Sequence, residues 1–151
     1  MKVLLAEDSR VQQRMLQRTL LDWGYEVVLA ANGHEAWQQL QGPDAPPLAI
    51  LDWMMPGLDG LEVCRMVRDK FRETPPYLIL LTARGAMQNI VEGLQSGAND
   101  FIVKPPDREE LKARVAVGRR VVELQQRLAQ RVRELESALD QVNQLHDLLP
   151  M

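Results

Sequence analysis

The segment ILDWMMPGLDG, residues 50–60, decides the fold. It begins as an apolar strand, ends that strand on the carboxylate of Asp52, and continues into Pro-Gly and Asp-Gly turn signals. An isolated Asp after a strand is most often a turn or capping residue. What Asp52 does therefore depends on whether other strands of the chain end in the same way.

Apolar runs of strand length recur along the chain and alternate with segments whose apolar residues have helical spacing. The runs are KVLLA (2–6), YEVVLA (25–30), LAIL (48–51), YLILL (77–81) and DFIVK (100–104). Short, almost uninterrupted apolar strands of this kind are typical of a parallel sheet that helices cover on both faces. The sequence predicts an α/β fold with a doubly wound, five-stranded parallel sheet.

The composition indicates one ordinary domain with an extension, because 151 residues exceed what five such units need. The chain is 46% hydrophobic and 26% charged, with a net charge of -3, which argues against disorder. Its apolar runs are too short to cross a bilayer, so we expect a cytoplasmic protein without a membrane partner. Cys64 is the single cysteine and is predicted to be a small buried residue.

Polar residues lie at or just beyond the ends of four of the five predicted strands, at one edge of the sheet. Glu7 and Asp8 follow the first, Asp52 follows the third, Thr82 follows the fourth, and Lys104 is the last residue of the fifth. Crowded carboxylates take up a proton or bind a cation, and hard oxygen ligands suit Mg²⁺. A cation, a lysine and a hydroxyl around one carboxylate predict a phosphoryl-transfer site in which Asp52 is the nucleophile.

Four ordered motifs carry a resemblance to a known family: LLAEDS (4–9), LDWMMPGLDG (51–60), ILLTA (79–83) and SGANDFIVKP (96–105). Over residues 1–120 the chain resembles the receiver domain of two-component response regulators, with its flavodoxin-like (βα)5 fold. The resemblance implies a signalling protein that is no enzyme, apart from catalysing its own phosphorylation and dephosphorylation. It also implies a sensor histidine kinase or a phosphotransfer protein as partner.

The resemblance assigns the metal and the phosphoacceptor residue by residue. Asp52 would accept the phosphoryl group. Asp8 and Asp52, with the backbone carbonyl of Met54, would bind Mg²⁺, and Glu7 would act on the metal through water.

The remaining roles concern the bound phosphoryl group. Lys104 would pair with it and Thr82 would donate a hydrogen bond to it. The backbone N–H groups of Met54 and Ala83 would complete the cradle.

Three further positions match variable or switching features of the family. Phe101 matches an aromatic residue that turns inward as Thr82 moves, although it also suits an ordinary core position. The Lys104-Pro105 bond matches one that is usually cis. Met54 and Arg84 occupy the two positions that influence how long the phosphate survives.

Residues 121–151 form a helical extension in this interpretation, continuing a helix that Asp107 can cap. Apolar residues seven apart predict a coiled coil and a homodimer, because the chain holds no second amphipathic helix as partner. They are Val121, Leu128, Leu135, Val142 and Leu149. Folding back onto the domain, and a parallel or an antiparallel pair, remain alternatives. Gly118 is expected to be a flexible joint at the end of the receiver.

Several functions compete with the phosphorylation switch. A phosphorylation-independent dimeric scaffold would keep the fold without the chemistry. The arginines after residue 113 form a basic stretch, but acidic residues follow it, so nucleic acid is not an expected partner. His146 has only a loose likeness to a phosphotransfer histidine. The sequence contains no recognisable effector motif, which fits either a stand-alone regulator or a chain cut before its output domain.

Overall fold

The computed structural model describes residues 1–71, 74–83 and 87–149. Five parallel strands form one sheet in the order β2-β1-β3-β4-β5. The strands are β1 (Lys2–Ala6), β2 (Glu26–Ala30), β3 (Leu48–Asp52), β4 (Tyr77–Thr82) and β5 (Asp100–Val103). The helices are α1 (Arg10–Asp22), α2 (Gly33–Gln41), α3 (Gly60–Lys70), α4 (Met87–Gln95) and α5 (Arg108–Leu148). The predicted fold class is confirmed.

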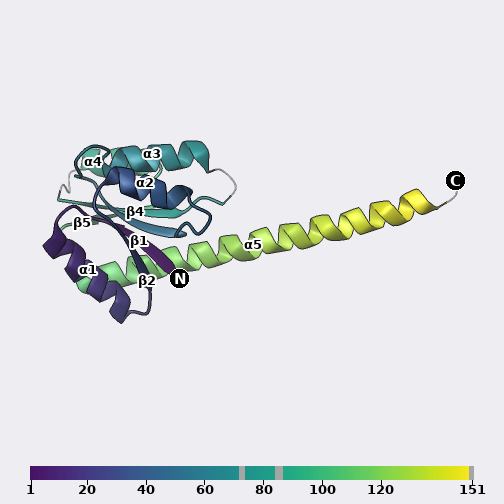
Figure 1. Cartoon of the computed structure of the whole chain (residues 1–151), viewed down its shortest axis with the longest axis horizontal. Coiled ribbons are helices and arrows are strands. Elements are labelled where there is room, and N and C mark those ends of the chain that lie inside the picture. The colour runs from purple at the N-terminus through teal and green to yellow at the C-terminus, as the bar shows by residue number, and fades with distance from the viewer. Residues whose placement is uncertain (72–73, 84–86, 150–151) are drawn as a thin grey trace.

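Helices cover both faces of the sheet (Figure 1). Helices α2, α3 and α4 pack on one face, and α1 and the first part of α5 pack on the other. Successive residues of a buried strand point to opposite faces, so Ile50 packs toward α1 and α5 while Leu51 packs toward α2 and α3. This double burial explains why β3 and β4 read as continuous apolar runs.

The turn between β3 and α3 is tight, as the Pro-Gly and Asp-Gly signals predict. Asp59 caps α3, because its side-chain Oδ1 accepts a hydrogen bond of 2.8 Å from the N–H of Glu62. Gly60 begins the helix so close to β3 that a Cβ atom there would lie 2.5 Å from the carbonyl oxygen of Asp52. A glycine at this position lets α3 start directly beside the end of the strand.

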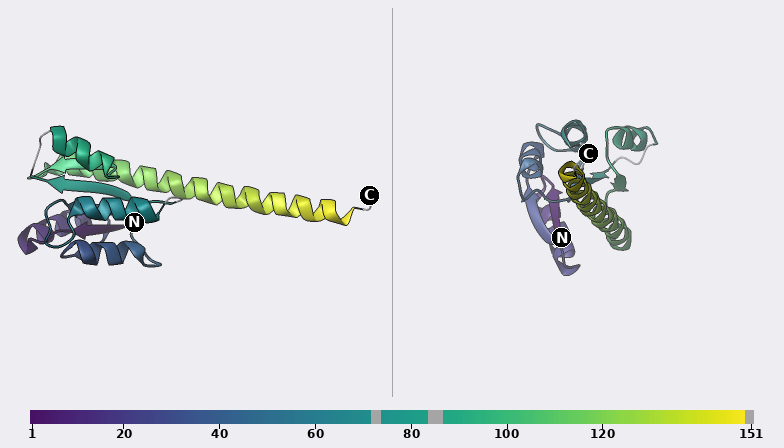
Figure 2. Two further views of the ribbon diagram at one scale, coloured as in Figure 1. Left: turned by 90° about the horizontal axis from the view of Figure 1, so that it is seen from above. Right: turned by 90° about the vertical axis from the view of Figure 1, so that its right-hand side faces the viewer.

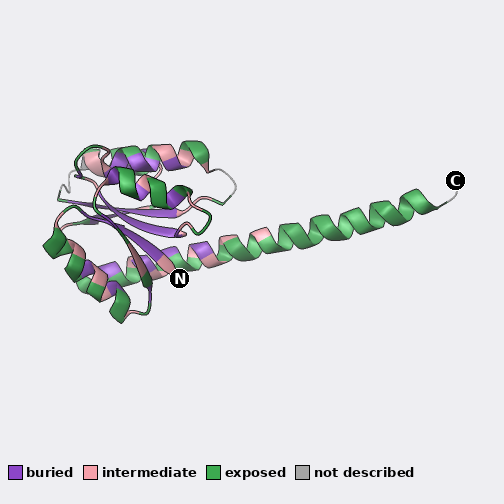
Figure 3. Cartoon of the chain, viewed as in Figure 1, coloured by how far each residue is buried: buried purple, intermediate pink, exposed green. Residues whose placement is uncertain are grey.

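Helix α5 is unbroken over 41 residues and extends far beyond the domain (Figure 2). Leu111, Val115, Gly118 and Val122 are its buried residues. From Leu124 onward the helix is mostly exposed (Figure 3). The helix crosses residue 120 without interruption, so the boundary between receiver and extension stays a prediction.

The expectation of a flexible joint at Gly118 is wrong. Gly118 is buried in the middle of α5, and a Cβ atom there would lie 2.8 Å from Leu48 Cδ1 and 2.8 Å from Tyr77 Cδ1. The missing side chain lets the helix approach the sheet closely. Leu48 and Tyr77 are the first residues of β3 and β4, the strands whose last residues are Asp52 and Thr82.

Two further observations concern Cys64 and the helices. Cys64 is fully buried in the core, as predicted. Within the described residues, none of the helices is long and apolar enough to span a membrane.

Candidate functional site

The structure brings the strand-end residues together at the carboxyl edge of the sheet. Glu7 and Asp8 directly follow β1, and Asp52 is the last residue of β3. Carboxylate oxygens of these three residues lie within 4.8 Å of one another. Glu7 and Asp52 are 1% and 5% exposed, whereas Asp8 is open to solvent.

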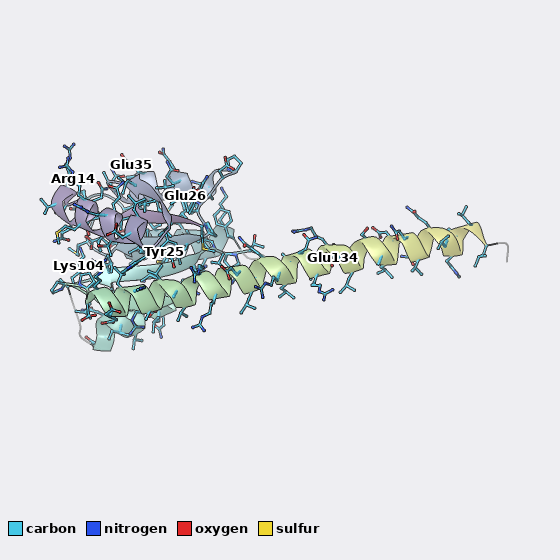
Figure 4. The ribbon with its side chains drawn as sticks, turned by 90° about the horizontal axis from the view of Figure 1, so that it is seen from below. Arg14, Tyr25, Glu26, Glu35, Lys104 and Glu134 are labelled. Atoms are coloured by element: carbon cyan, nitrogen blue, oxygen red, sulfur yellow. The ribbon has the colours of Figure 1, made fainter. Side chains whose placement is uncertain are left out.

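Lys104 supplies the positive charge that this cluster requires. Its Nζ donates hydrogen bonds of 2.7 Å to Asp52 Oδ2 and 2.8 Å to Glu7 Oε2. The Lys104 side chain is 16% exposed, so both ion pairs are partly shielded from water. Lys104 lies at the end of the domain away from the tip of α5 (Figure 4).

The backbone fixes Lys104 beside the end of β4. The N–H of Lys104 donates a 2.7 Å hydrogen bond to the carbonyl of Thr82. Thr82 is buried, with 1% of its surface exposed. The hydroxyl, ammonium and carboxylate groups predicted for the site therefore share one edge, at the ends of the four neighbouring strands β1, β3, β4 and β5.

The close packing of these charged groups shifts the pKa values of Glu7 and Lys104. Burial raises the pKa of Glu7 to about 7, although the hydrogen bond from Lys104 works in the opposite direction. Burial alone would lower the pKa of Lys104, but hydrogen bonds to Asp52 and Glu7 outweigh it and raise that pKa. Lys104 thus stays charged while Glu7 holds a proton part of the time near neutral pH.

The donor set fits a hard divalent cation. The two buried carboxylates share the ammonium group of Lys104, so the three carboxylates together leave negative charge to be neutralised. Mg²⁺ prefers oxygen ligands and commonly uses one or two protein carboxylates, keeping other positions for water or phosphate oxygens. The open side of the cluster at Asp8 leaves room for such ligands.

The loop after β3 holds Asp52 in place. The N–H of Met54 donates a 3.3 Å hydrogen bond to Asp52 Oδ1, and the N–H of Trp53 bonds the carbonyl of Leu81 at 2.8 Å. The Met54 side chain is 58% exposed beside the site. Ala83 directly follows β4 and is exposed, and Arg84 lies outside the described residues.

Phe101 is 9% exposed and packs edge-to-face against Trp53, with ring centroids 6.5 Å apart. It therefore lies inward, next to the residue that follows Asp52. The Lys104-Pro105 peptide bond is cis, as the resemblance implied.

Sequence reasoning missed two glutamines at the start of α1. Gln12 Oε1 accepts a 3.1 Å hydrogen bond from Lys104 Nζ. Gln13 Nε2 donates to the carbonyls of Glu7 and Ala30, at 3.2 and 3.3 Å. Polar residues on an exposed helix carry no periodic signal, so only the three-dimensional arrangement reveals them.

Comparisons with known proteins agree with this geometry. The family model for the response regulator receiver domain matches residues 3–116. The chain is 43% identical over 115 residues to the response regulator MprA of Mycobacterium avium, an alignment covering 76% of this chain and 49% of that protein. The chain thus spans about half the length of the curated relatives it matches.

Two solved structures show the same fold. The receiver domain of the Francisella response regulator 1452 is 32% identical, with a TM-score of 0.71, and the match covers 78% of this chain and 94% of that one. The second is a co-crystal structure from Saccharomyces cerevisiae of the phosphotransfer protein Ypd1 with the receiver domain of Ssk1. It matches with 28% identity and a TM-score of 0.68, covering 74% of this chain and 83% of the matched chain.

Proposed function

Because the chain belongs to the response regulator receiver family, we propose that it is a phosphorylation-driven switch in a two-component pathway. Asp52 accepts a phosphoryl group from a histidine kinase or phosphotransfer protein. The observation that carries this proposal is the buried Asp52 carboxylate, bonded by Lys104 and adjacent to Glu7 and Asp8.

The chemistry assigned to Asp52 is a simple displacement at phosphorus. A carboxylate oxygen of Asp52 forms the new bond, while the bond from phosphorus to the donor's histidine nitrogen breaks. Lys104 is already 2.7 Å from Asp52 and needs little movement to pair with the incoming phosphoryl oxygens. Thr82 and the N–H groups of Met54 and Ala83 are the proposed hydrogen-bond donors to the other oxygens.

Mg²⁺ bound at this site would supply charge neutralisation at the transferring group. Asp8, Asp52 and the Met54 carbonyl are the proposed ligands, with Glu7 acting through water. The carboxylates gathered at this edge support that assignment. Lys104, which forms ion pairs with both Asp52 and Glu7, offsets the repulsion between their carboxylates.

Labelling with a small acyl-phosphate donor tests the proposal. With Mg²⁺ present, we expect one phosphoryl group per chain by intact mass, and none in Asp52→Asn. Asp44→Asn is the matched control, because Asp44 is an exposed loop carboxylate and its loss should not alter labelling. Equal labelling of Asp52→Asn, or no labelling of the wild type, would refute this assignment.

The proposed readout of the switch is a homodimer formed through α5. Beyond the domain, α5 exposes a line of large apolar side chains that a single copy leaves in water, among them Leu128, Leu135 and Val142, each at least 60% exposed. A helix of this type gains most of its stability by packing its apolar face against another helix. Residues 1–120 as receiver and 121–151 as dimerisation or signalling extension are part of this proposal.

A phosphorylation-independent scaffold is the alternative, and one measurement separates it from the switch. Sedimentation of the chain with and without a non-hydrolysable aspartyl-phosphate mimic should show a change in self-association. The same measurement on Asp52→Asn should show no change. If the mimic affects self-association identically in the wild type and in Asp52→Asn, the scaffold is favoured.

A further inference from the structure

The exposed part of α5 divides into two halves of opposite charge. Residues 119–133 contain five arginines and one glutamate, whereas residues 134–148 contain four acidic residues and neither lysine nor arginine. Both halves belong to the same unbroken helix. The charge reverses between Arg133 and Glu134, near the middle of the part of α5 that extends beyond the domain.

We propose that two copies of the chain pair through residues 119–148 of α5 in antiparallel orientation, with a two-fold axis between Arg133 and Glu134. The inference rests on the self-association proposed above and adds the direction of the pair. In this arrangement a residue that stands a given number of positions before the axis in one copy has a level partner in the other copy. That partner stands the same number of positions after the axis. The basic half of one copy then runs beside the acidic half of its partner.

Most of the charged residues and the central apolar residues match in class across the axis. Four arginines fall level with four acidic residues: Arg133 with Glu134, Arg131 with Glu136, Arg127 with Asp140, and Arg120 with Asp147. Apolar residues fall level with apolar residues: Val132 with Leu135, Ala129 with Ala138, and Leu128 with Leu139. An isologous pair requires such self-complementarity of one surface.

The central apolar residues have the spacing of a helix-pairing seam. Leu128, Val132, Leu135 and Leu139 follow one another at steps of four, three and four residues. They are 65%, 43%, 69% and 59% exposed in the single chain. Around the proposed axis this set maps onto itself, so each of the four side chains lies level with another of the four.

The seam lies on a different side of α5 from the residues that pack against the receiver. Gly118 and Val122 face the sheet, and both are buried. Leu128 is six residues beyond Val122, a rotation of about 600°, which places it about 120° away around the helix. Leu128 is 65% exposed, so this side of the helix leaves space for a partner.

A parallel pair would place each charged residue level with the same residue of the partner, so like charges would face like charges. The ion pairs within the helix do little to offset that repulsion. Arg131 to Glu134 spans 3.9 Å and Arg119 to Glu123 spans 3.8 Å, but all four side chains are well exposed to solvent. Electrostatic complementarity therefore favours the antiparallel pair.

Disulfide trapping with single-cysteine variants tests the orientation. Leu128→Cys and Leu139→Cys are co-expressed with different tags and oxidised, then compared with each variant alone. The antiparallel pair predicts a mixed disulfide between the two variants and at least tenfold less crosslinking of either variant with itself. Cys64 is buried and should not react, and the wild-type protein provides that blank.

A matched control uses Gln130→Cys with Ser137→Cys, which are also level with each other but lie on the side of α5 away from the seam. This pair should not crosslink. Efficient crosslinking of Leu128→Cys with itself would overturn the antiparallel direction while leaving the dimer of the proposed function intact. A monomer by sedimentation, with no crosslink in any combination, would overturn the dimer and the inference together, and phosphorylation of Asp52 would still be measured separately.

Discussion

Replacing Gly118 with alanine tests whether close packing or flexibility explains this glycine. An alanine in a helix interior is about 1 kcal/mol more favourable than a glycine, so a flexible joint would be stabilised by the change. At Gly118, however, the new Cβ would lie 2.8 Å from both Leu48 Cδ1 and Tyr77 Cδ1. Forcing an extra methyl group into a packed core costs about 1–3 kcal/mol.

The clash should outweigh the gain, because the atoms that must move belong to fully buried Leu48 and largely buried Tyr77. We expect a net loss of about 1 kcal/mol for Gly118→Ala and a larger loss for Gly118→Val. Urea unfolding at one fixed protein concentration measures both. Ser137→Ala, on the exposed part of α5, is the control and should be neutral or slightly stabilising. A Gly118→Ala protein more stable than the wild type would refute the packing argument.

Three further predictions concern other parts of the molecule. The pKa of Glu7 is raised to about 7, so protons compete with Mg²⁺ for the site near neutral pH. The apparent affinity of the protein for Mg²⁺, followed by tryptophan fluorescence, should therefore rise from pH 6 to pH 8 and then level off. The Glu7→Gln variant should show a flatter dependence of this affinity on pH. Burial raises the pKa of Cys64 to about 12, so iodoacetamide at pH 8 should label the unfolded chain and leave the folded chain unlabelled. Arg68 donates hydrogen bonds to the carbonyls of Gly97 and Pro76 at 2.6 and 2.9 Å. Arg68→Ala should therefore lower the free energy of unfolding by about 2–3 kcal/mol, measured from urea midpoints. An unchanged midpoint would contradict this prediction.

The sheet could be predicted almost residue by residue, because strands that are buried on both faces contain little except apolar residues. The strand expected at 2–6 is β1, and the one expected at 77–81 falls short of β4 by the single residue Thr82. The clustering of Glu7, Asp52 and Lys104 followed from topology, since parallel strands bring their carboxyl ends to one edge.

Contacts that depend on tertiary distance could not be predicted. Gln12 reaches Lys104 across 92 residues of sequence, and no spacing rule links the two. Gly118 was read from helix propensity alone, which cannot report that Leu48 and Tyr77 lie against it. Arg68 was likewise indistinguishable from an exposed basic residue, although it bonds two carbonyl groups of distant loops.

The close seat of α5 on the sheet turns the rest of the helix into a lever arm. The helix is held at Gly118, against the first residues of β3 and β4, and about 26 residues extend beyond Val122, or roughly 39 Å at 1.5 Å per residue. A tilt of only about 5° at that seat displaces the far end of such an arm by roughly 3 Å, comparable to the rise of two helical residues. A sub-ångström adjustment between two strands is thereby magnified, at the tip, to the size of a side-chain contact.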